Sequence, residues 1–341
     1  MEEINVHGLD DLLQKMAEQD KFSGVALVHR NGDVMFEKAY GLACKTFNIK
    51  NNMNTKFNIG SLNKLITKTA ILQLMQQGLV DLDDLVGKHL PEFRKDIAEK
   101  VKIRHLISFT SGLGDYFNEK FSSAIGQLRK LDDFVELFID DPLLFEPGER
   151  RHYSNAGYVV LGKIIEAISG MDYYDYIREN VYRLAGMTDS DHYELDAPVE
   201  NRATGYTRMS DCCAPETTER RSNHFIIGSR GSPAGGGYST AKDLMRFDLA
   251  IDNALLLDPE RSKRVMRPID APESDPKTAV LAGGASGLCA LYFKFFELGY
   301  SVFILSNYDP QDVEPLVKPI RALFIPEEEE EREVVKFRDE K

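Results

Sequence analysis

Predicted β-strands lie at both ends of this chain, with a long and mainly helical segment between them. Asn31-Gly32 joins the first two strands, and an Asn-Gly pair between apolar runs is a strong signal for a tight hairpin. A single hairpin is marginally stable in water, so the two ends are expected to pair with each other. This predicts one antiparallel sheet built from both chain ends. The four strands are expected over residues 22–30, 34–40, 288–296 and 300–306.

Helical periodicity accounts for most of the rest of the chain, and it predicts an α+β fold. The helix over 61–77 has apolar residues on more than one stripe, which predicts that it is largely buried, and Gly78 suits its C-terminal end. Helices are expected over 8–20, 61–77, 102–108, 131–140, 157–169, 173–183, 240–252 and 311–324. We expect a discontinuous α/β lobe (1–60 with 250–326), a mainly helical lobe (61–249) and a disordered acidic tail (327–341).

Charge and composition exclude several classes of function. The chain has 341 residues, enough for about two to three domain-sized units, and a net charge of −13. No basic cluster with interleaved aromatic residues offsets that charge, so no nucleic-acid partner is expected. No apolar run reaches the roughly 18 residues that span a bilayer, and no secretory leader is recognisable. The sequence therefore predicts a soluble cytoplasmic protein without a membrane partner.

The cysteines and histidines predict neither a disulfide framework nor a metal site. Four scattered cysteines in a chain without an export signal are expected to be reduced thiols. Cys212-Cys213 with His224 would supply adjacent ligands without a fourth, which is a poor zinc pattern. No cofactor is expected, and the sequence does not indicate an oligomeric state.

A Ser-x-x-Lys pattern is the first candidate for catalysis, because residues three apart at a helix start share one face. A hydroxyl there can meet an amine, and the first-turn amides favour developing negative charge. The pattern occurs at Ser61–Lys64, at Ser239–Lys242 and at Ser274–Lys277. The third lies in a loop rich in Pro and Asp, and in the second the Ser-Thr pair suits the cap of a helix. Only Ser61 lies between a glycine turn and a long buried helix, so it is the candidate nucleophile.

A longer series of motifs resembles the serine β-lactamase-related proteins, in particular class C β-lactamases and the related esterases, D-aminopeptidases and penicillin-binding-protein-like hydrolases. The resemblance runs in order over roughly residues 20–310 and implies the β-lactamase/transpeptidase-like fold. The motifs are Phe57-Asn-Ile-Gly-Ser61-Leu-Asn-Lys64, Gly78-Leu-Val-Asp-Leu-Asp-Asp, Ile103-Arg-His-Leu-Ile-Ser-Phe-Thr-Ser-Gly-Leu113, Phe145-Glu-Pro-Gly-Glu, Tyr153-Ser-Asn155-Ala-Gly-Tyr158 and Gly235-Gly-Gly-Tyr-Ser-Thr-Ala-Lys-Asp-Leu-Met-Arg-Phe247.

The resemblance implies a role for each of four residues. Ser61 would be the acylated nucleophile, Lys64 its proton acceptor, and Tyr153 a partner in proton transfer that later helps to activate water. Asn155 would hold a substrate oxygen and steady Lys64. Each residue also has a structural interpretation: Ser61 as a helix cap, Lys64 as a surface lysine, Tyr153 as a half-buried tyrosine, and Asn155 as a cap before Ala156.

The third motif of the family departs from its usual pattern. Relatives carry Lys-Thr-Gly or His-x-Gly on a strand that faces the nucleophile, whereas the matching positions here are Leu281-Ala282-Gly283. An alternative register over Lys277-Thr278-Ala279 lies four residues too early and lacks the glycine. In the preferred register the amides of Gly284 and Ser61 would form the oxyanion hole. The preceding segment also looks short, which predicts that the active-site edge lacks a strand.

Phe109 and the glycine-rich segment 231–237 each need a separate interpretation. Phe109 stands where the family commonly has a histidine, and we interpret that position as structural. The glycine-rich segment 231–237 lacks the Gly-Lys-Ser/Thr ending of a phosphate-binding loop. The resemblance implies instead that it supports a helix.

We therefore expect a serine hydrolase of esterase type that forms an acyl-enzyme on Ser61 and takes a small-molecule acyl substrate. A leucine at position 281 cannot bind the carboxylate of β-lactams or cell-wall peptides, which favours neutral esters or amides. D-aminopeptidase or weak β-lactamase activity would use the same site. The alternative is a catalytically weak scaffold or binding protein, which a structure separating Lys64 Nζ from Ser61 Oγ would favour.

Overall fold

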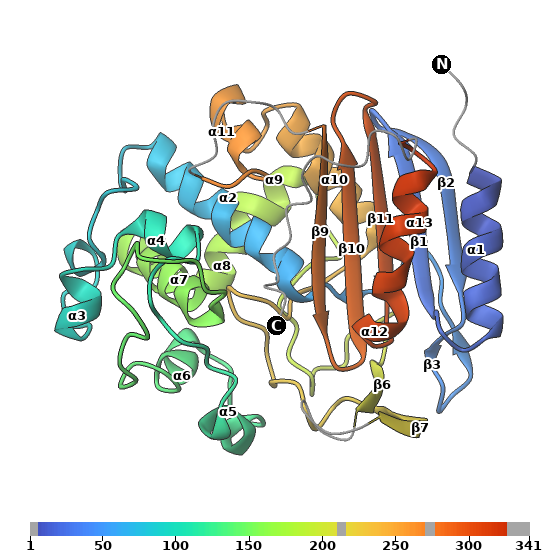
Figure 1. Ribbon diagram of the computed structural model, residues 1–341, viewed down its shortest axis with the longest axis horizontal. Coiled ribbons are helices and arrows are strands. Elements are labelled where there is room, and N and C mark those ends of the chain that lie inside the picture. The colour runs from blue at the N-terminus through green and yellow to red at the C-terminus, as the bar shows by residue number, and fades with distance from the viewer. Residues whose placement is uncertain (1–5, 210–215, 270–276, 326–341) are drawn as a thin grey trace.

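The computed structural model describes residues 6–209, 216–269 and 277–325, and its central feature is an antiparallel sheet (Figure 1). This sheet has five strands in the order β2-β1-β11-β10-β9, so strands from the two chain ends lie side by side. Its strands are β1 (Gly24–Arg30), β2 (Asp33–Tyr40), β9 (Thr278–Ala285), β10 (Leu288–Phe295) and β11 (Tyr300–Ser306). The predicted α+β fold and the sheet made from both ends are confirmed.

The register shows how the two ends join. β1 pairs with β11 along its whole length, from Gly24 opposite Ser306 to Arg30 opposite Tyr300. The hairpin between β1 and β2 turns at Asn31 and Gly32, which have φ angles of 49° and 100°. Positive φ at both central positions is what a tight two-residue turn requires, and Asn and Gly tolerate it best.

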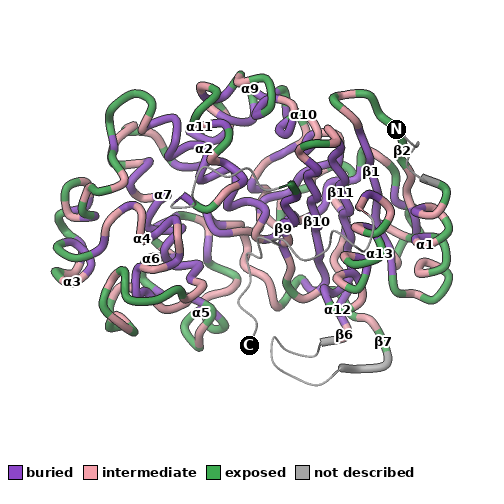
Figure 2. Tube along the Cα trace, turned by 45° about the horizontal axis from the view of Figure 1, so that its top comes forward, coloured by how far each residue is buried: buried purple, intermediate pink, exposed green. Residues whose placement is uncertain are grey.

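Helices cover both faces of the sheet, which is why β10 and β11 are buried at every position (Figure 2). The helices α1 (Val6–Glu18), α12 (Pro310–Val313) and α13 (Val317–Ala322) pack on one face, where Leu13 and Ile320 join an apolar cluster with strand residues. On the other face Leu281, Tyr292 and Phe303 belong to the same apolar core as the buried residues of α2 (Asn63–Gln76) and α7 (Asn155–Ser169).

The mainly helical part of the molecule surrounds α2 (Asn63–Gln76), in which every residue from Asn63 to Leu74 is buried. The other helices outside the sheet's first face are α3 (Lys95–Ala98), α4 (Ile103–Ile107), α5 (Glu119–Ala124), α6 (Leu131–Val135), α7 (Asn155–Ser169), α8 (Tyr173–Ile177), α9 (Arg183–Ala185), α10 (Ala241–Asp252) and α11 (Pro259–Arg264). Short strands pair as β3 (Leu42–Cys44) with β4 (Ile49–Lys50), β5 (Phe57–Asn58) with β8 (Tyr238–Ser239), and β6 (Tyr206–Met209) with β7 (Glu216–Ser222).

Several elements differ from the sequence-based expectation. β9, which pairs with β10 from Thr278 opposite Phe295 to Ala285 opposite Leu288, was absent from the strands expected from the residue pattern. It carries the third-motif positions 281–283 and is the last strand in the order of the sheet, so the expectation that this edge lacks a further strand stays a prediction. The helix expected over 173–183 is interrupted by a π-helical turn at Arg178–Tyr182. The expected lobe boundary at 249/250 falls inside α10, which packs on β1 and β11. The division into two lobes stays a prediction, and the acidic tail lies outside the described residues.

A buried ionic cluster attaches α10 to the sheet. Asp248 of α10 is fully buried and accepts hydrogen bonds from Ser301 Oγ at 2.7 Å and from Lys294 Nζ at 2.8 Å. His29 Nε2 lies 3.0 Å from the same carboxylate. Buried charges are tolerated only when they are paired and hydrogen-bonded. This pairing fixes α10 over three neighbouring strands.

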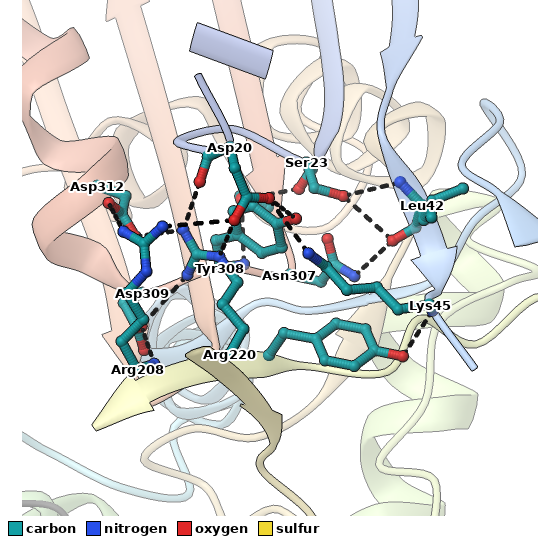
Figure 3. Close-up of polar contacts among 12 residues, drawn as sticks. Asp20, Ser23, Leu42, Lys45, Arg208, Arg220, Asn307, Tyr308, Asp309 and Asp312 are labelled. Atoms are coloured by element: carbon teal, nitrogen blue, oxygen red, sulfur yellow. Dashed lines mark hydrogen bonds and ion pairs between the residues drawn. The ribbon is translucent and has the colours of Figure 1, made fainter. Parts of the chain in front are cut away.

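A second ionic cluster joins the β6–β7 hairpin to the end of the sheet (Figure 3). The Arg220 side chain is 2 % exposed and lies within 3.2 Å of Asp20 and 2.8 Å of Asp312. Asp309 accepts from the backbone N–H groups of both Arg208, at 2.8 Å, and Gly287, at 2.7 Å. Because Gly287 lies in the turn between β9 and β10, this cluster anchors the strand that borders the candidate site.

Candidate active site

Ser61 and Lys64 lie at the turn that leads into α2. Ser61 belongs to a 3₁₀ turn, Gly60–Leu62, and Lys64 is the second residue of α2. Gly60 has a φ of 50°, and a Cβ atom there would come within 2.8 Å of Gly284 N. The turn therefore needs a glycine, because the backbone of β9 approaches it so closely.

The Ser61 hydroxyl contacts two other polar groups of the site. Its Oγ lies 2.7 Å from the Tyr153 hydroxyl and accepts a hydrogen bond from Lys64 Nζ at 3.2 Å. Ser61 is half-buried, whereas Lys64 is only 1 % exposed. The interpretations of Ser61 as a cap and Lys64 as a surface lysine therefore fail: no side chain caps α2 or this turn, and Lys64 is buried.

The buried Lys64 ammonium has an acceptor for each of its three donors. Besides Ser61 Oγ, it donates to Asn155 Oδ1 and to the backbone carbonyl of Ala234, both at 2.6 Å. The Tyr153 ring centroid lies 4.7 Å from Nζ, a cation–π distance. An ammonium without such partners would be costly to bury, so these contacts hold Lys64 Nζ beside Ser61.

The start of α7 positions Tyr153 and Asn155. Ser154 is the N-cap of this helix, because its Oγ accepts from Gly157 N at 3.2 Å. The same hydroxyl donates to the Gly114 carbonyl at 2.6 Å and so ties α7 to the loop between α4 and α5. The interpretation of Asn155 as the cap is therefore wrong. Its side chain is directed to Lys64 instead.

The preferred register of the third motif is the one that lies beside Ser61. A Cβ atom on Gly283 would come within 2.2 Å of the Ile59 carbonyl oxygen and 2.7 Å of Ser61 N. Lys277 lies at the far end of β9, where its ammonium is 4.0 Å from Glu297. Leu281 is 1 % exposed and belongs to the core between the sheet and the mainly helical part of the molecule. Its side chain offers no cation to a substrate.

Two groups of the site were not predicted from the sequence. The Ala234 carbonyl, in the glycine-rich segment 231–237, accepts from Lys64, and a backbone acceptor has no residue signature. The Asp115 carboxylate accepts from Asn155 Nδ2 at 2.8 Å. Its position two residues after the recognised motif that ends at Leu113 was the available signal.

The second Ser-x-x-Lys pair does not form a comparable site. Ser239 Oγ is buried and bonds to Ser190 Oγ at 2.8 Å, while Lys242 Nζ lies 3.1 Å from Glu37. Thr240 caps α10 through Asp243 N at 3.1 Å, so the expected helix cap is confirmed. Ser274 lies outside the described residues.

Most of the chain matches a known protein family. The family model described as Beta-lactamase matches residues 9–286. The chain belongs to the beta-lactamase family. This membership supports a serine hydrolase in general terms, without fixing the substrate.

Individual relatives of this beta-lactamase family member include proteins named for penicillin binding. "Penicillin-binding protein 4*" of Bacillus subtilis is 31 % identical over 253 residues, which are 71 % of this chain and 55 % of that protein. "Putative penicillin-binding protein PbpX" of the same organism is 27 % identical over 267 residues, 78 % of this chain and 64 % of that protein. The chain thus spans between half and two thirds of the length of these two relatives.

Solved structures show the same fold. A penicillin binding protein from Bacillus halodurans has a TM-score of 0.79 and 29 % identity, with 90 % of this chain and 98 % of that chain covered. A D-amino acid amidase from Ochrobactrum anthropi SV3 has a TM-score of 0.75 and 22 % identity, with 92 % and 98 % covered. The second likeness is one of fold.

Neither a metal site nor a membrane span is found in the described part of the chain. No three His, Cys, Asp or Glu residues within 6–209, 216–269 and 277–325 are grouped so that they could hold a metal ion. Cys212 and Cys213 lie outside these ranges. Over the same ranges, none of the helices combines the length and apolar character needed to cross a bilayer.

Proposed function

We propose that this protein hydrolyses small neutral esters through an acyl-enzyme on Ser61. The observation that carries the proposal is the double contact of Ser61 Oγ, 2.7 Å from the Tyr153 hydroxyl and 3.2 Å from Lys64 Nζ. A serine hydroxyl is a weak nucleophile until a nearby base accepts its proton. Both partners are within the reach that general base catalysis requires.

In the proposed acylation step, Ser61 Oγ attacks the ester carbonyl carbon while its proton passes to the Lys64–Tyr153 pair. The negative charge on the carbonyl oxygen is received by the backbone N–H groups of Ser61 and Gly284. The carbon–oxygen bond to the alcohol then breaks, and the alcohol leaves with the transferred proton. Water, activated by the same pair, attacks the acyl carbon, releases the acid and regenerates Ser61.

The preference for neutral substrates follows from Leu281. The residue is 1 % exposed, packs in the core and carries no charge. A carboxylate at that edge of the substrate would lose water without gaining a cation from this position. We therefore expect slower turnover of substrates with a carboxylate there, β-lactams included. Amide hydrolysis by the same acylation is the related activity to test, since a D-amino acid amidase shares the fold.

The scaffold alternative gains nothing from the geometry. Its favourable case was a structure in which Lys64 Nζ is kept away from Ser61 Oγ, and the two atoms lie 3.2 Å apart. This distance, at a half-buried serine, supports the hydrolase proposal over the scaffold alternative.

The deciding experiment is hydrolysis of p-nitrophenyl butyrate by wild type, Ser61→Ala and Ser239→Ala. Ser239 begins the other described Ser-x-x-Lys pair, so it is a matched control. We expect the Ser61 variant to lose turnover and the Ser239 variant to keep it. Equal turnover by wild type and Ser61→Ala would contradict the proposal. A succinyl ester of the same phenol and D-alanine p-nitroanilide would then test charge and amide preference.

A further inference from the structure

The loop between α4 and α5 supports both of the fixed acceptors that hold the Lys64 ammonium. One acceptor is Asn155 Oδ1 and the other is the Ala234 carbonyl. Two consecutive loop residues reach them: Asp115 contacts Asn155, and Tyr116 contacts the segment that carries Ala234. Neither loop residue has a part in the proposed chemistry.

The Asp115 contact determines which way the Asn155 amide points. The two ends of this amide have similar shapes, but one accepts a hydrogen bond and the other donates. Lys64 Nζ, which can only donate, lies 2.6 Å from Oδ1, and the Asp115 carboxylate accepts from Nδ2 at 2.8 Å. In the flipped orientation a donor would face the ammonium, and an acceptor would face the carboxylate. Asp115 and Lys64 together therefore keep the oxygen end on Lys64.

The Tyr116 contact acts on the second acceptor. Tyr116 is 4 % exposed, and its hydroxyl lies 3.0 Å from Ser232 Oγ. Ser232 Oγ in turn accepts a hydrogen bond from Ala234 N at 3.2 Å. The Ser232 hydroxyl therefore links the Tyr116 phenol to Ala234, whose carbonyl accepts the hydrogen bond from Lys64 Nζ. The Gly114 carbonyl beside Asp115 accepts from Ser154 Oγ, which fixes the loop to α7.

We infer that Asp115 and Tyr116 are positioning residues of the acylation site, which hold Asn155 and Ala234 in the geometry that directs Lys64 Nζ at Ser61. The inference rests on the proposed function, because it assigns to the pair a part in activating Ser61. Displacing a catalytic group by about 1 Å can cost up to about 100-fold in rate, so loss of these supports should be measurable.

The test uses Asp115→Ala, Asp115→Asn and Tyr116→Phe, with Asp133→Asn as the matched control. Asp133 accepts from the backbone N–H groups of Arg129 and Lys130 at the start of α6 and has no contact with the site. Two rates are measured: turnover of p-nitrophenyl butyrate, and modification of Ser61 by a fluorophosphonate, followed by intact-protein mass spectrometry. The second rate reports an activated serine without requiring an ester substrate.

We expect Asp115→Ala to lower both rates by about 10- to 100-fold, with KM changed less than about threefold, because orientation of Lys64 is lost. Tyr116→Phe, which removes one hydroxyl, should lower both by about three- to tenfold, and the Asp133 variant should match wild type. Asp115→Asn keeps an acceptor for Asn155 Nδ2 but removes the charge. It should retain most of its activity at neutral pH.

The pH profile separates this role from a merely structural one. The titratable groups that face Lys64 directly are the phenols of Tyr153 and Tyr158. The next charged or titratable groups are Asp115 and Tyr116 of the loop, and Arg151, whose guanidinium lies 5.3 Å from the Phe109 ring centroid. Loss of the Asp115 charge disfavours the ammonium form of Lys64. The acidic limb of kcat/KM should therefore move to lower pH in both Asp115 variants, and it should stay in place in Tyr116→Phe and Asp133→Asn.

Two results would overturn the inference. One is folded Asp115→Ala and Tyr116→Phe proteins with both rates within twofold of wild type. The other is an Asp115→Ala protein that loses turnover only on α-aminoacyl esters through a higher KM, which would make Asp115 a binding group for a substrate ammonium.

If Asp115→Ala does not fold, the inference is tested by the acidic limb of the Asp115→Asn pH profile and by the two rates of Tyr116→Phe. Wild type that reacts with the fluorophosphonate but hydrolyses no ester would refute the proposed esterase function, and the labelling rates would still judge the positioning role.

Discussion

The ring of Phe109 stacks on the ring of Tyr153, with centroids 4.8 Å apart and an interplanar angle of 26°. The Phe109 backbone has a φ of 62°, in the left-handed region that bulky residues rarely adopt. Such strain persists only where the surroundings impose it, and it is concentrated at functional sites. Phe109 thus packs directly on the phenol that lies beside Ser61, and its interpretation as a structural position stays a prediction.

The first prediction compares Phe109→Ala with Phe109→Gly. Phe109 is 4 % exposed, so loss of its ring should reduce the free energy of unfolding by about 3–5 kcal/mol in either variant. The left-handed backbone costs a non-glycine residue about 1–2 kcal/mol, so the glycine variant should be the more stable of the two by about 1 kcal/mol. Urea unfolding monitored by circular dichroism measures both values.

The same pair of substitutions at Phe121 is the control for Phe109. Phe121 is also buried but lies within α5, where glycine is less favourable than alanine by about 1 kcal/mol. The order of the two variants should therefore reverse between the two sites. Glycine less stable than alanine at both positions would show that the Phe109 backbone is not strained.

The second prediction concerns the contact between β9 and the Ser61 turn. A Cβ atom at Gly283 would lie 2.2 Å from the Ile59 carbonyl oxygen and 2.7 Å from Ser61 N, closer than real atoms approach. Gly283→Ala must push β9 away from Ser61 and enlarge the gap across which Ser61 N and Gly284 N are proposed to bind the oxyanion. Loss of one oxyanion donor costs roughly 100- to 1000-fold in kcat, so a loss on that scale is expected.

Gly126→Ala is the control for Gly283→Ala, because a Cβ atom there would have nothing within 4 Å. Steady-state ester hydrolysis and thermal unfolding should be measured on both variants. Activity of Gly283→Ala within threefold of wild type would contradict the close approach of β9 to the nucleophile.

The sequence was sufficient for those parts of the fold that local chemistry determines. The Asn31-Gly32 turn and the apolar strands predicted a sheet from both ends, and glycine before Ser61 with a buried helix after it selected one of three Ser-x-x-Lys pairs. The residue pattern did not indicate β9, because Thr278–Ala285 is rich in alanine and glycine, residues that are depleted in strands; only the family resemblance placed 281–283 on a strand. The small side chains of β9 are explained by the tertiary contact with Ser61, which no local pattern reveals.

The candidate site shows the same limit. Its side chains carry recognisable motifs, but the Ala234 carbonyl contacts Lys64 through the backbone, which any residue type could supply. The contact of Asp115 with Asn155 exists only when α7 packs against the loop that contains Asp115, so the sequence alone does not reveal it.

The third prediction concerns acid sensitivity through His192, which is 1 % exposed. Its Nε2 lies 2.9 Å from Nδ2 of Asn63, the residue between Leu62 and Lys64 in the Ser61 motif. Burial lowers the pKa of His192 from 6.5 to about 4. The unfolded chain therefore binds a proton at this histidine more readily than the folded chain does. The stability associated with neutral His192 is complete above pH 6.5 and is lost as the pH falls toward 4, by roughly 3 kcal/mol in total.

His192→Gln should remove that pH dependence, because glutamine does not titrate. The measurement is the free energy of unfolding in urea at pH 7 and at pH 4 for wild type, His192→Gln and His7→Gln, the last being an exposed histidine as control. Wild type and the His7 variant should lose roughly 3 kcal/mol more than His192→Gln between these pH values. Equal losses in all three proteins would mean that the folded state accepts a proton at His192 as easily as the unfolded state. Burial of the His192 ring would then not lower the free energy of unfolding at acidic pH.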